Sequence, residues 1–241
     1  MIFIDHSTVH FLGREMEAYG FLAVLGAVLT ILGITYLAHR RKLDASFAFR
    51  CALLTIFSSA AFHIFFQYKV SAEALLFYYP MGFVIVPLVF WLLSRIFRQN
   101  GKEFFRLGLL ASFSYSVTSR FSCLFGGCCY GPPWGGFPAL VYGPATHNPL
   151  PGVPLFPLQP VAALVFLIIL GFAVWVFLKG GSGILLAGAS TLNLAVYYTG
   201  ILITPATTGG KTAIMAAVIT LYIAALGLFV YNFRKRGNFH E

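Results

Sequence analysis

The sequence predicts an all-α membrane protein of seven transmembrane helices, with its N-terminus outside and its C-terminus in the cytoplasm. Its composition is 59% hydrophobic and only 10% charged, whereas soluble domains carry about 25% charged residues. Apolar runs long enough to span about 30 Å of hydrocarbon as a helix follow one another along the chain. Basic residues flank these runs mainly on one side. These observations predict one integral membrane domain over residues 1–241.

The expected spans follow the apolar runs in order. They cover residues 18–38, 51–67, 75–94, 106–126, 157–178, 183–203 and 212–232. Residues 1–17 mix polar and apolar side chains without a basic start, so we expect the first span to be an uncleaved anchor. The longest connection, residues 130–156, is rich in proline, which cannot continue a helix. We expect it to be an outer loop with a functional role.

The distribution of basic residues predicts the orientation. Twelve of the 16 fall in one set of loops, and only Arg14, Lys69 and Lys211 fall in the opposite set. Cytoplasmic loops are enriched in lysine and arginine, so the N-terminus and the loop 130–156 are expected outside and the C-terminus in the cytoplasm. No partner nucleic acid is expected, because the basic residues flank spans and are not interleaved with stacking aromatic side chains. The twelve are Arg40, Arg41, Lys42, Arg50, Arg95, Arg98, Lys102, Arg106, Lys179, Arg234, Lys235 and Arg236.

The most informative stretch is residues 119–131, which read SRFSCLFGGCCYG. Arg120 lies well inside an apolar run, where a charge costs about 2.5–3.5 kcal/mol on insertion scales. Its long side chain could place the charged guanidinium at the membrane surface. Alternatively, the paired N–H donors of the guanidinium could bind a lipid phosphate. Gly126 and Gly127, with Gly131, could bring backbone N–H groups close to a ligand, or could simply end the helix.

Three cysteines crowd the same stretch and leave several interpretations open. Cys123, Cys128 and Cys129 could be packing residues, thiols that line a site, a disulfide or metal ligands. Together with His147 they could form a Cys₃His zinc site, but we assign no metal ligand and no cofactor. The acidic residues all fall in loops, ends or flanks, which counts against a proton-coupled transporter.

These residues resemble the signature of prolipoprotein diacylglyceryl transferase, roughly Gly-Arg-Ile-Gly-Asn-Phe-Ile-Asn-Gly-Glu-Leu-Tyr-Gly. Tyr19, before Gly20, and Gln159, in Pro157-Leu158-Gln159, resemble further parts of that family. The resemblance implies seven spans and transfer of diacylglyceryl from phosphatidylglycerol to the lipobox cysteine of a lipoprotein precursor. It also implies that Arg120 binds the phosphate, that Tyr19 contacts substrate, and that Tyr130 and Gly131 close the motif.

The chain also departs from the family pattern. Cys123 stands where the motif has asparagine, and Cys128 where it has glutamate. The family's His-Gly-Gly has no match, and in the second span only His63 stands near the place of an expected arginine. We therefore expect the proton carrier to be His63, His147 or Cys128, with substrate contacts from Tyr19, Arg120, Cys123, Gly126, Gly127, Tyr130, Gly131 and Gln159.

Three functions are compatible with these observations. The first is a transferase that moves a lipid-derived group from a phosphatidylglycerol-like phospholipid to a thiol. The second is a non-catalytic binder of lipid or lipoprotein that kept the fold. The third is a thiol-redox or metal-handling membrane protein built on the cysteines.

Overall fold

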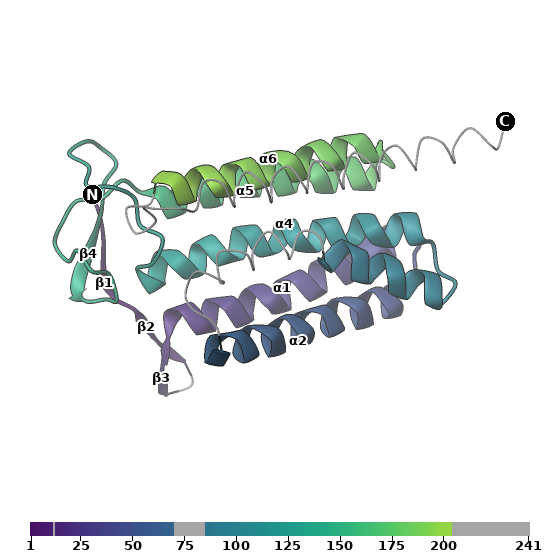
Figure 1. Cartoon of the computed structure of the whole chain (residues 1–241), viewed down its shortest axis with the longest axis horizontal. Helices are drawn as coiled ribbons and strands as arrows, with labels where there is room; N and C mark the ends of the chain where they lie inside the picture. Colours follow the sequence, from purple (N-terminus) through teal and green to yellow (C-terminus); the bar gives the residue numbers. More distant parts are fainter. Residues whose placement is uncertain (12, 70–84, 204–241) are drawn as a thin grey trace.

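The computed structural model describes residues 1–11, 13–69 and 85–203. Long helices run side by side, and short strands gather at one end of the bundle (Figure 1). We call this end the strand end. The helices are α1 (Ala18–Arg40), α2 (Ala45–Lys69), a segment over Ile85–Ile96, α4 (Gly101–Gly126), α5 (Leu158–Leu178) and α6 (Gly183–Ile203).

Helix α4 is the centre of the bundle and packs against α1, α2, α5 and α6. It begins after Asn100, whose side chain accepts a hydrogen bond from the Glu103 backbone N–H at 3.3 Å, as an N-cap does. Phe104, Leu107 and Phe113 are fully buried along it. Because α4 contacts α1, α2, α5 and α6, its position constrains how these helices are arranged.

Helices α1 and α4 approach closely where α1 has no side chain. A Cβ at Gly26 would lie 2.5 Å from the Thr118 Cβ on α4. One turn further along α1, the Thr30 hydroxyl lies 2.8 Å from the Ser114 hydroxyl across the same interface. Close approach at small residues combined with hydroxyl hydrogen bonds is typical of helix packing in membranes.

Two small sheets form the strand end. Strand β1 (Ile2–His6) pairs in parallel with β4 (Leu140–Ala145), and β2 (Thr8–Phe11) pairs antiparallel with β3 (Arg14–Glu17). Ile4, Leu140 and Tyr142 of the first sheet form a second, smaller core together with Leu155 of the proline-rich segment. The N-terminal residues and the proline-rich segment therefore lie at the same end of the molecule.

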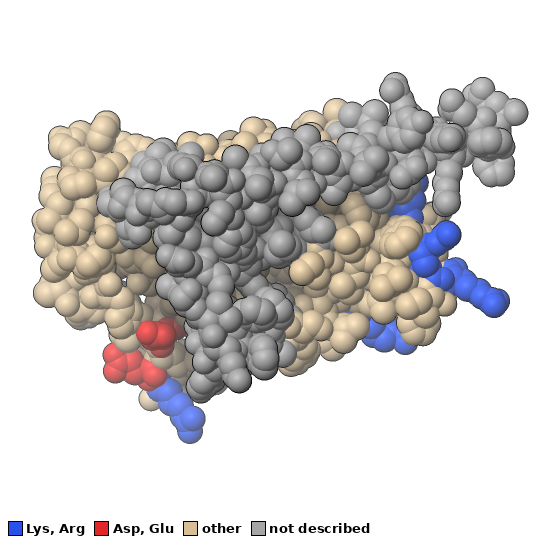
Figure 2. Space-filling view, viewed as in Figure 1, with Lys and Arg blue, Asp and Glu red and all other residues tan. Residues whose placement is uncertain are grey.

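Most of the lysine and arginine side chains visible in Figure 2 gather at the opposite end, which we call the basic end. There the Glu103 carboxylate lies 2.9 Å from Arg106 Nη1 and 3.6 Å from Arg41 Nη2. Arg106 also donates a hydrogen bond to the Gly181 carbonyl at 3.0 Å, between α5 and α6. Arg106 is buried, and the group joins α4 to the end of α1 and to the α5–α6 connection, so part of the basic pattern has a structural role.

The expected all-α fold with seven transmembrane helices is wrong. Within the described residues, only α1 and α5 are long and apolar enough to cross a membrane, and the chain also forms strands. Helix α4 carries four charges, Lys102, Glu103, Arg106 and Arg120. In α2, the apolar helix found among the described side chains covers Ala45–Ser58. Expected span 212–232 and the first half of span 75–94 lie outside the described residues.

Helix α6, which covers the expected span 183–203, is not among the helices that meet this test within the described residues. It contains Ser190, Thr191 and Asn193, and the Asn193 amide oxygen accepts a hydrogen bond from Ser116 of α4 at 3.0 Å. Both Asn193 and Ser116 are fully buried. The helix therefore presents polar groups to the interior of the bundle, which the apolar run alone did not indicate.

We expect Gly26→Ala to lower the apparent melting temperature of the purified protein in detergent. The added methyl would have to displace Thr118, and overpacking of this kind costs about 1–3 kcal/mol. Gly33→Ala is the matched control on the same helix, since a Cβ there meets nothing within 4 Å. Equal melting temperatures for the two variants would contradict the close approach of α1 and α4.

Candidate functional site

The candidate site lies where α4 ends. Gly127 follows the last helical residue with a left-handed φ of 69°, a conformation that glycine adopts without strain. A Cβ at this position would lie 3.0 Å from the Asn148 backbone nitrogen, so the close approach also requires glycine. The Asn148 side chain donates a hydrogen bond to the Gly127 carbonyl at 2.8 Å. This turn directs the next residues back over the end of the helix.

The turn brings three thiols together. Cys123 Sγ lies 3.9 Å from Cys129 Sγ, and the sulfur atoms of Cys123, Cys128 and Cys129 all lie within 4.8 Å of one another. Cys129 has a left-handed φ of 55°, which is uncommon for a residue other than glycine. Cys128 is exposed and the other two are half-buried. We call these three residues the thiol cluster.

Arg120 lies one turn before Cys123 on α4 and is 3% exposed. Its guanidinium carbon stacks 5.0 Å from the centre of the Tyr197 ring and 5.8 Å from that of Phe166. Such aromatic contacts stabilise a buried cation. The guanidinium also hydrogen-bonds Cys129. A permanent positive charge is therefore held between α4, α5 and α6, directly against the thiol cluster.

The thiols of the cluster differ in acidity. Hydrogen bonds from Cys123 and then Cys128 hold the pKa of Cys129 well below its ordinary value, and the Arg120 charge acts in the same direction against burial. For Cys128, the hydrogen bond with Cys123 lowers the pKa, but the hydrogen bond with Cys129 and burial raise it to about 12. Of the thiols in the cluster, Cys129 therefore has the lowered pKa and loses its proton most readily.

A buried polar network positions the loop that carries the cluster. Gln159, fully buried at the start of α5, donates to the Cys128 carbonyl at 2.7 Å and to the Tyr142 hydroxyl at 3.1 Å. The Tyr142 hydroxyl in turn donates to the Leu124 carbonyl at 2.9 Å. Burial raises the pKa of Tyr142, so its hydroxyl keeps the proton that it donates. The network joins β4, α5 and the end of α4.

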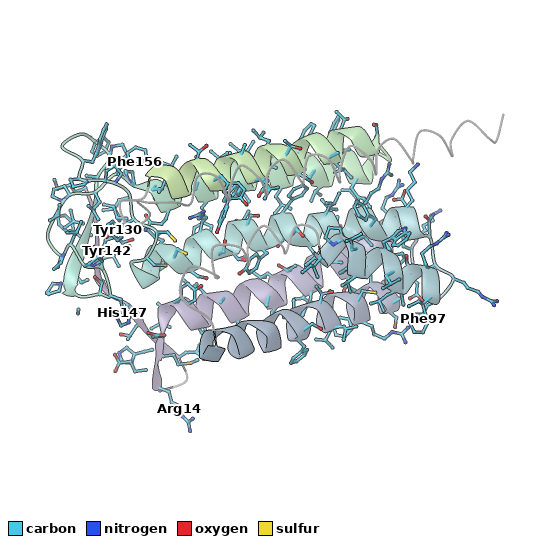
Figure 3. The ribbon with its side chains drawn as sticks, viewed as in Figure 1. Arg14, Phe97, Tyr130, Tyr142, His147 and Phe156 are labelled. Carbon is cyan, nitrogen blue, oxygen red and sulfur yellow. The ribbon has the colours of Figure 1, made fainter. Side chains whose placement is uncertain are left out.

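The remaining motif residues pack around this turn. A Cβ at Gly126 would lie 3.1 Å from Tyr19 Cδ2, so Tyr19 of α1 lies directly against the end of α4. At Gly131 a Cβ would lie 2.5 Å from the Phe156 carbonyl oxygen. Tyr130 packs on the small core of the strand end, near Tyr142 and Phe156 (Figure 3). These two glycines therefore allow close packing around the turn.

The histidines lie elsewhere. His147 is exposed, and its Nε2 lies 3.0 Å from Glu17 Oε1 on β3. Among the described residues, the group that could hold a metal consists of the three cysteines without His147. His63 is part of α2, but its side chain lies outside the described part of the structure.

Sequence reasoning gave too little attention to Cys129, Tyr142, Asn148 and Tyr197. For Cys129 a signal was present: four residues separate Cys123 from Cys128, a spacing within the range of paired zinc ligands, and Cys129 follows directly. Tyr142, Asn148 and Tyr197 reach the site from distant segments, so no local pattern indicated them.

No protein-family model matches the chain, and no curated protein matches it.

We expect Tyr142→Phe to destabilise the strand end. The change removes a hydrogen bond to the Leu124 carbonyl and one from Gln159, which typically contribute about 0.5–1.5 kcal/mol each. The measurement is the apparent melting temperature in detergent. Tyr130→Phe is the control, because the Tyr130 hydroxyl makes no hydrogen bond within the described part of the chain. A Tyr142→Phe melting temperature equal to that of the parent would contradict the network.

Proposed function

We propose that this protein is a phospholipid-dependent transferase that moves a lipid-derived group to a thiol acceptor. The observation that carries the proposal is the buried Arg120 guanidinium held against the thiol cluster at the end of α4. It supports the resemblance of residues 119–131 to the diacylglyceryl transferase signature, since transfer from a phospholipid needs a cation beside the leaving phosphate. The donor that we propose resembles phosphatidylglycerol, and the acceptor is the cysteine of a lipoprotein precursor or a related thiol.

We also propose that the protein lies in the bacterial inner membrane with the site facing outside. Only 28% of the most apolar stretch of α1, and 39% of that of α5, is buried inside the protein, unlike the core helix of a soluble domain. Large apolar side chains such as Val24 and Ile168 are about two-thirds exposed. Both helices run from the strand end to the basic end. Lysine and arginine favour the cytoplasmic side, so the strand end would face outward.

The proposed reaction balances without a redox partner. The acceptor sulfur forms a bond to the glyceryl carbon of the donor, and the bond between that carbon and the phosphate oxygen breaks. The bonding electrons pass to the phosphate oxygen, where the Arg120 charge stabilises the product. The thiol proton passes to a base, for which His63 and His147 are the candidates on this chain, because the raised pKa of Cys128 keeps that thiol protonated.

We expect Arg120→Ala to abolish transfer of labelled diacylglyceryl from phosphatidylglycerol to a lipobox peptide, measured with the full-length purified protein. Arg120→Lys keeps the charge but loses the paired donors. It should bind the phospholipid about tenfold more weakly or worse, since charged hydrogen bonds contribute about 1.5–3 kcal/mol. Arg14→Ala is the control, an exposed arginine at the same end of the molecule (Figure 3).

Two outcomes would decide against this proposal. Phospholipid binding that is unchanged in Arg120→Ala would contradict the role of the arginine. Binding without any transfer in the parent protein would favour the non-catalytic binder over the transferase.

The orientation can be measured by thiol labelling in intact cells. In a Cys128→Ser background, Ala145→Cys on β4 should react with a membrane-impermeant maleimide from outside. Lys179→Cys, just after α5, should react only after the membrane is opened. Both positions are exposed, so access to the reagent depends on the side of the membrane. Labelling of both from the same side would contradict the proposed placement.

A further inference from the structure

The sulfur atoms of the thiol cluster have the separation that one metal ion requires. Zinc binds thiolate sulfur at about 2.3 Å, so two sulfurs on one tetrahedral or trigonal zinc lie about 3.8–4.0 Å apart. Cys123 Sγ and Cys129 Sγ lie 3.9 Å apart, and all three sulfurs fall within 4.8 Å. Only a small movement of Cys128, the exposed member at the surface, would complete a three-sulfur site.

The surrounding structure fixes this arrangement independently of any metal. Cys123 is part of the last turn of α4, and the left-handed residues Gly127 and Cys129 fold the loop back toward it. The Gln159 amide holds the Cys128 carbonyl from the opposite side. Outer contacts of this kind orient the ligands of metal sites and tune the affinity for the ion.

Charge balance is also favourable. Three thiolates and one divalent ion carry a net charge of −1, which costs free energy when it is partly buried. Arg120 supplies the compensating positive charge at hydrogen-bonding distance from Cys129. No carboxylate belongs to the cluster among the described residues, so its donors are all soft sulfur ligands. Such ligands select zinc or copper(I) over magnesium or calcium.

We propose that Cys123, Cys128 and Cys129 bind one thiophilic metal ion, with zinc as the reference ion, and leave its fourth position open. Structural zinc sites have four protein ligands, whereas catalytic ones have three and an open position. His147, the other nearby ligand type that sequence analysis considered, is paired with Glu17.

The role of the open position rests on the proposed function. The acceptor thiol would bind there and pass its proton to the same base, because the metal would stabilise the thiolate. Its sulfur would then form the bond to the glyceryl carbon, while the carbon–oxygen bond breaks and its electrons go to the phosphate. The metal is neither oxidised nor reduced in this step.

The metal site is tested by titrating the reduced, full-length protein with Co²⁺, which replaces zinc and absorbs strongly when bound to thiolates. We expect one equivalent to bind with a sulfur charge-transfer band, and Zn²⁺ to displace it. Cys123→Ser, Cys128→Ser and Cys129→Ser should each weaken the band and the affinity. Cys51→Ala, in the core of the helical bundle, should leave both unchanged. Arg120→Ala should lower the affinity about 10- to 100-fold, as loss of an outer partner typically does.

The result of a second measurement does not depend on whether any variant folds. In the unmutated protein, Zn²⁺ should protect Cys128 from alkylation by N-ethylmaleimide. The proposed metal site is wrong if no cobalt band appears, if Cys129→Ser leaves the band unchanged, or if Zn²⁺ does not slow the alkylation of Cys128. Free thiols can also be counted after denaturation of the protein without reductant. If only two of the four cysteines react, the cluster holds a disulfide and not a metal ion.

Failure of the site and failure of the proposed function can be told apart. Metal binding without any transfer in the parent protein would leave the site standing and remove the transferase. Transfer that continues at the parent rate after chelation, or in a Cys123→Ser, Cys129→Ser double variant, would leave the transferase standing and remove the catalytic role of the metal.

Discussion

The left-handed turn that ends α4 at Gly127 is the constraint on which the site depends. A helix that continued past this point would carry Cys128 and Cys129 away along its axis. Because the chain reverses instead, both return to the level of Cys123 and of the buried Arg120. Asn148, Gln159 and Tyr142 bind the carbonyl groups around the turn, so segments far apart in the sequence hold one short loop in place.

The dominance of helices, and the bounds of α5 and α6 to within one residue, could be predicted from apolar runs. Helix α4 ends where expected but begins at Gly101, before the expected start at residue 106, because its first turn carries charged residues. The number of membrane spans could not be predicted, because an apolar run does not show which of its polar residues face another helix. Asn193 and Ser116 bond to each other inside the bundle. The β1 and β4 segments are short and distant, and their pairing depends on a small core that only the folded chain forms.

The sequence indicated where the candidate site lies along the chain, but not which distant residues contact it in the fold. The motif at residues 119–131 indicated Arg120 and the cysteines as a unit, and the structure places them in contact. The sequence did not show that Gly126 and Gly131 are needed for packing against Tyr19 and Phe156, nor that His147 is paired with Glu17. Both depend on tertiary contacts, which motif spacing does not encode.

The parallel pairing of β1 with β4 has a consequence for biosynthesis. Strand β1 is synthesised well before β4, so it must wait until residues 140–145 have been made before it finds its partner. Contacts between such distant segments form slowly, since the loop between them must close first. Contacts between sequence neighbours such as α1 and α2 can form earlier, so the end of the molecule that carries the thiols would form later than that part of the bundle.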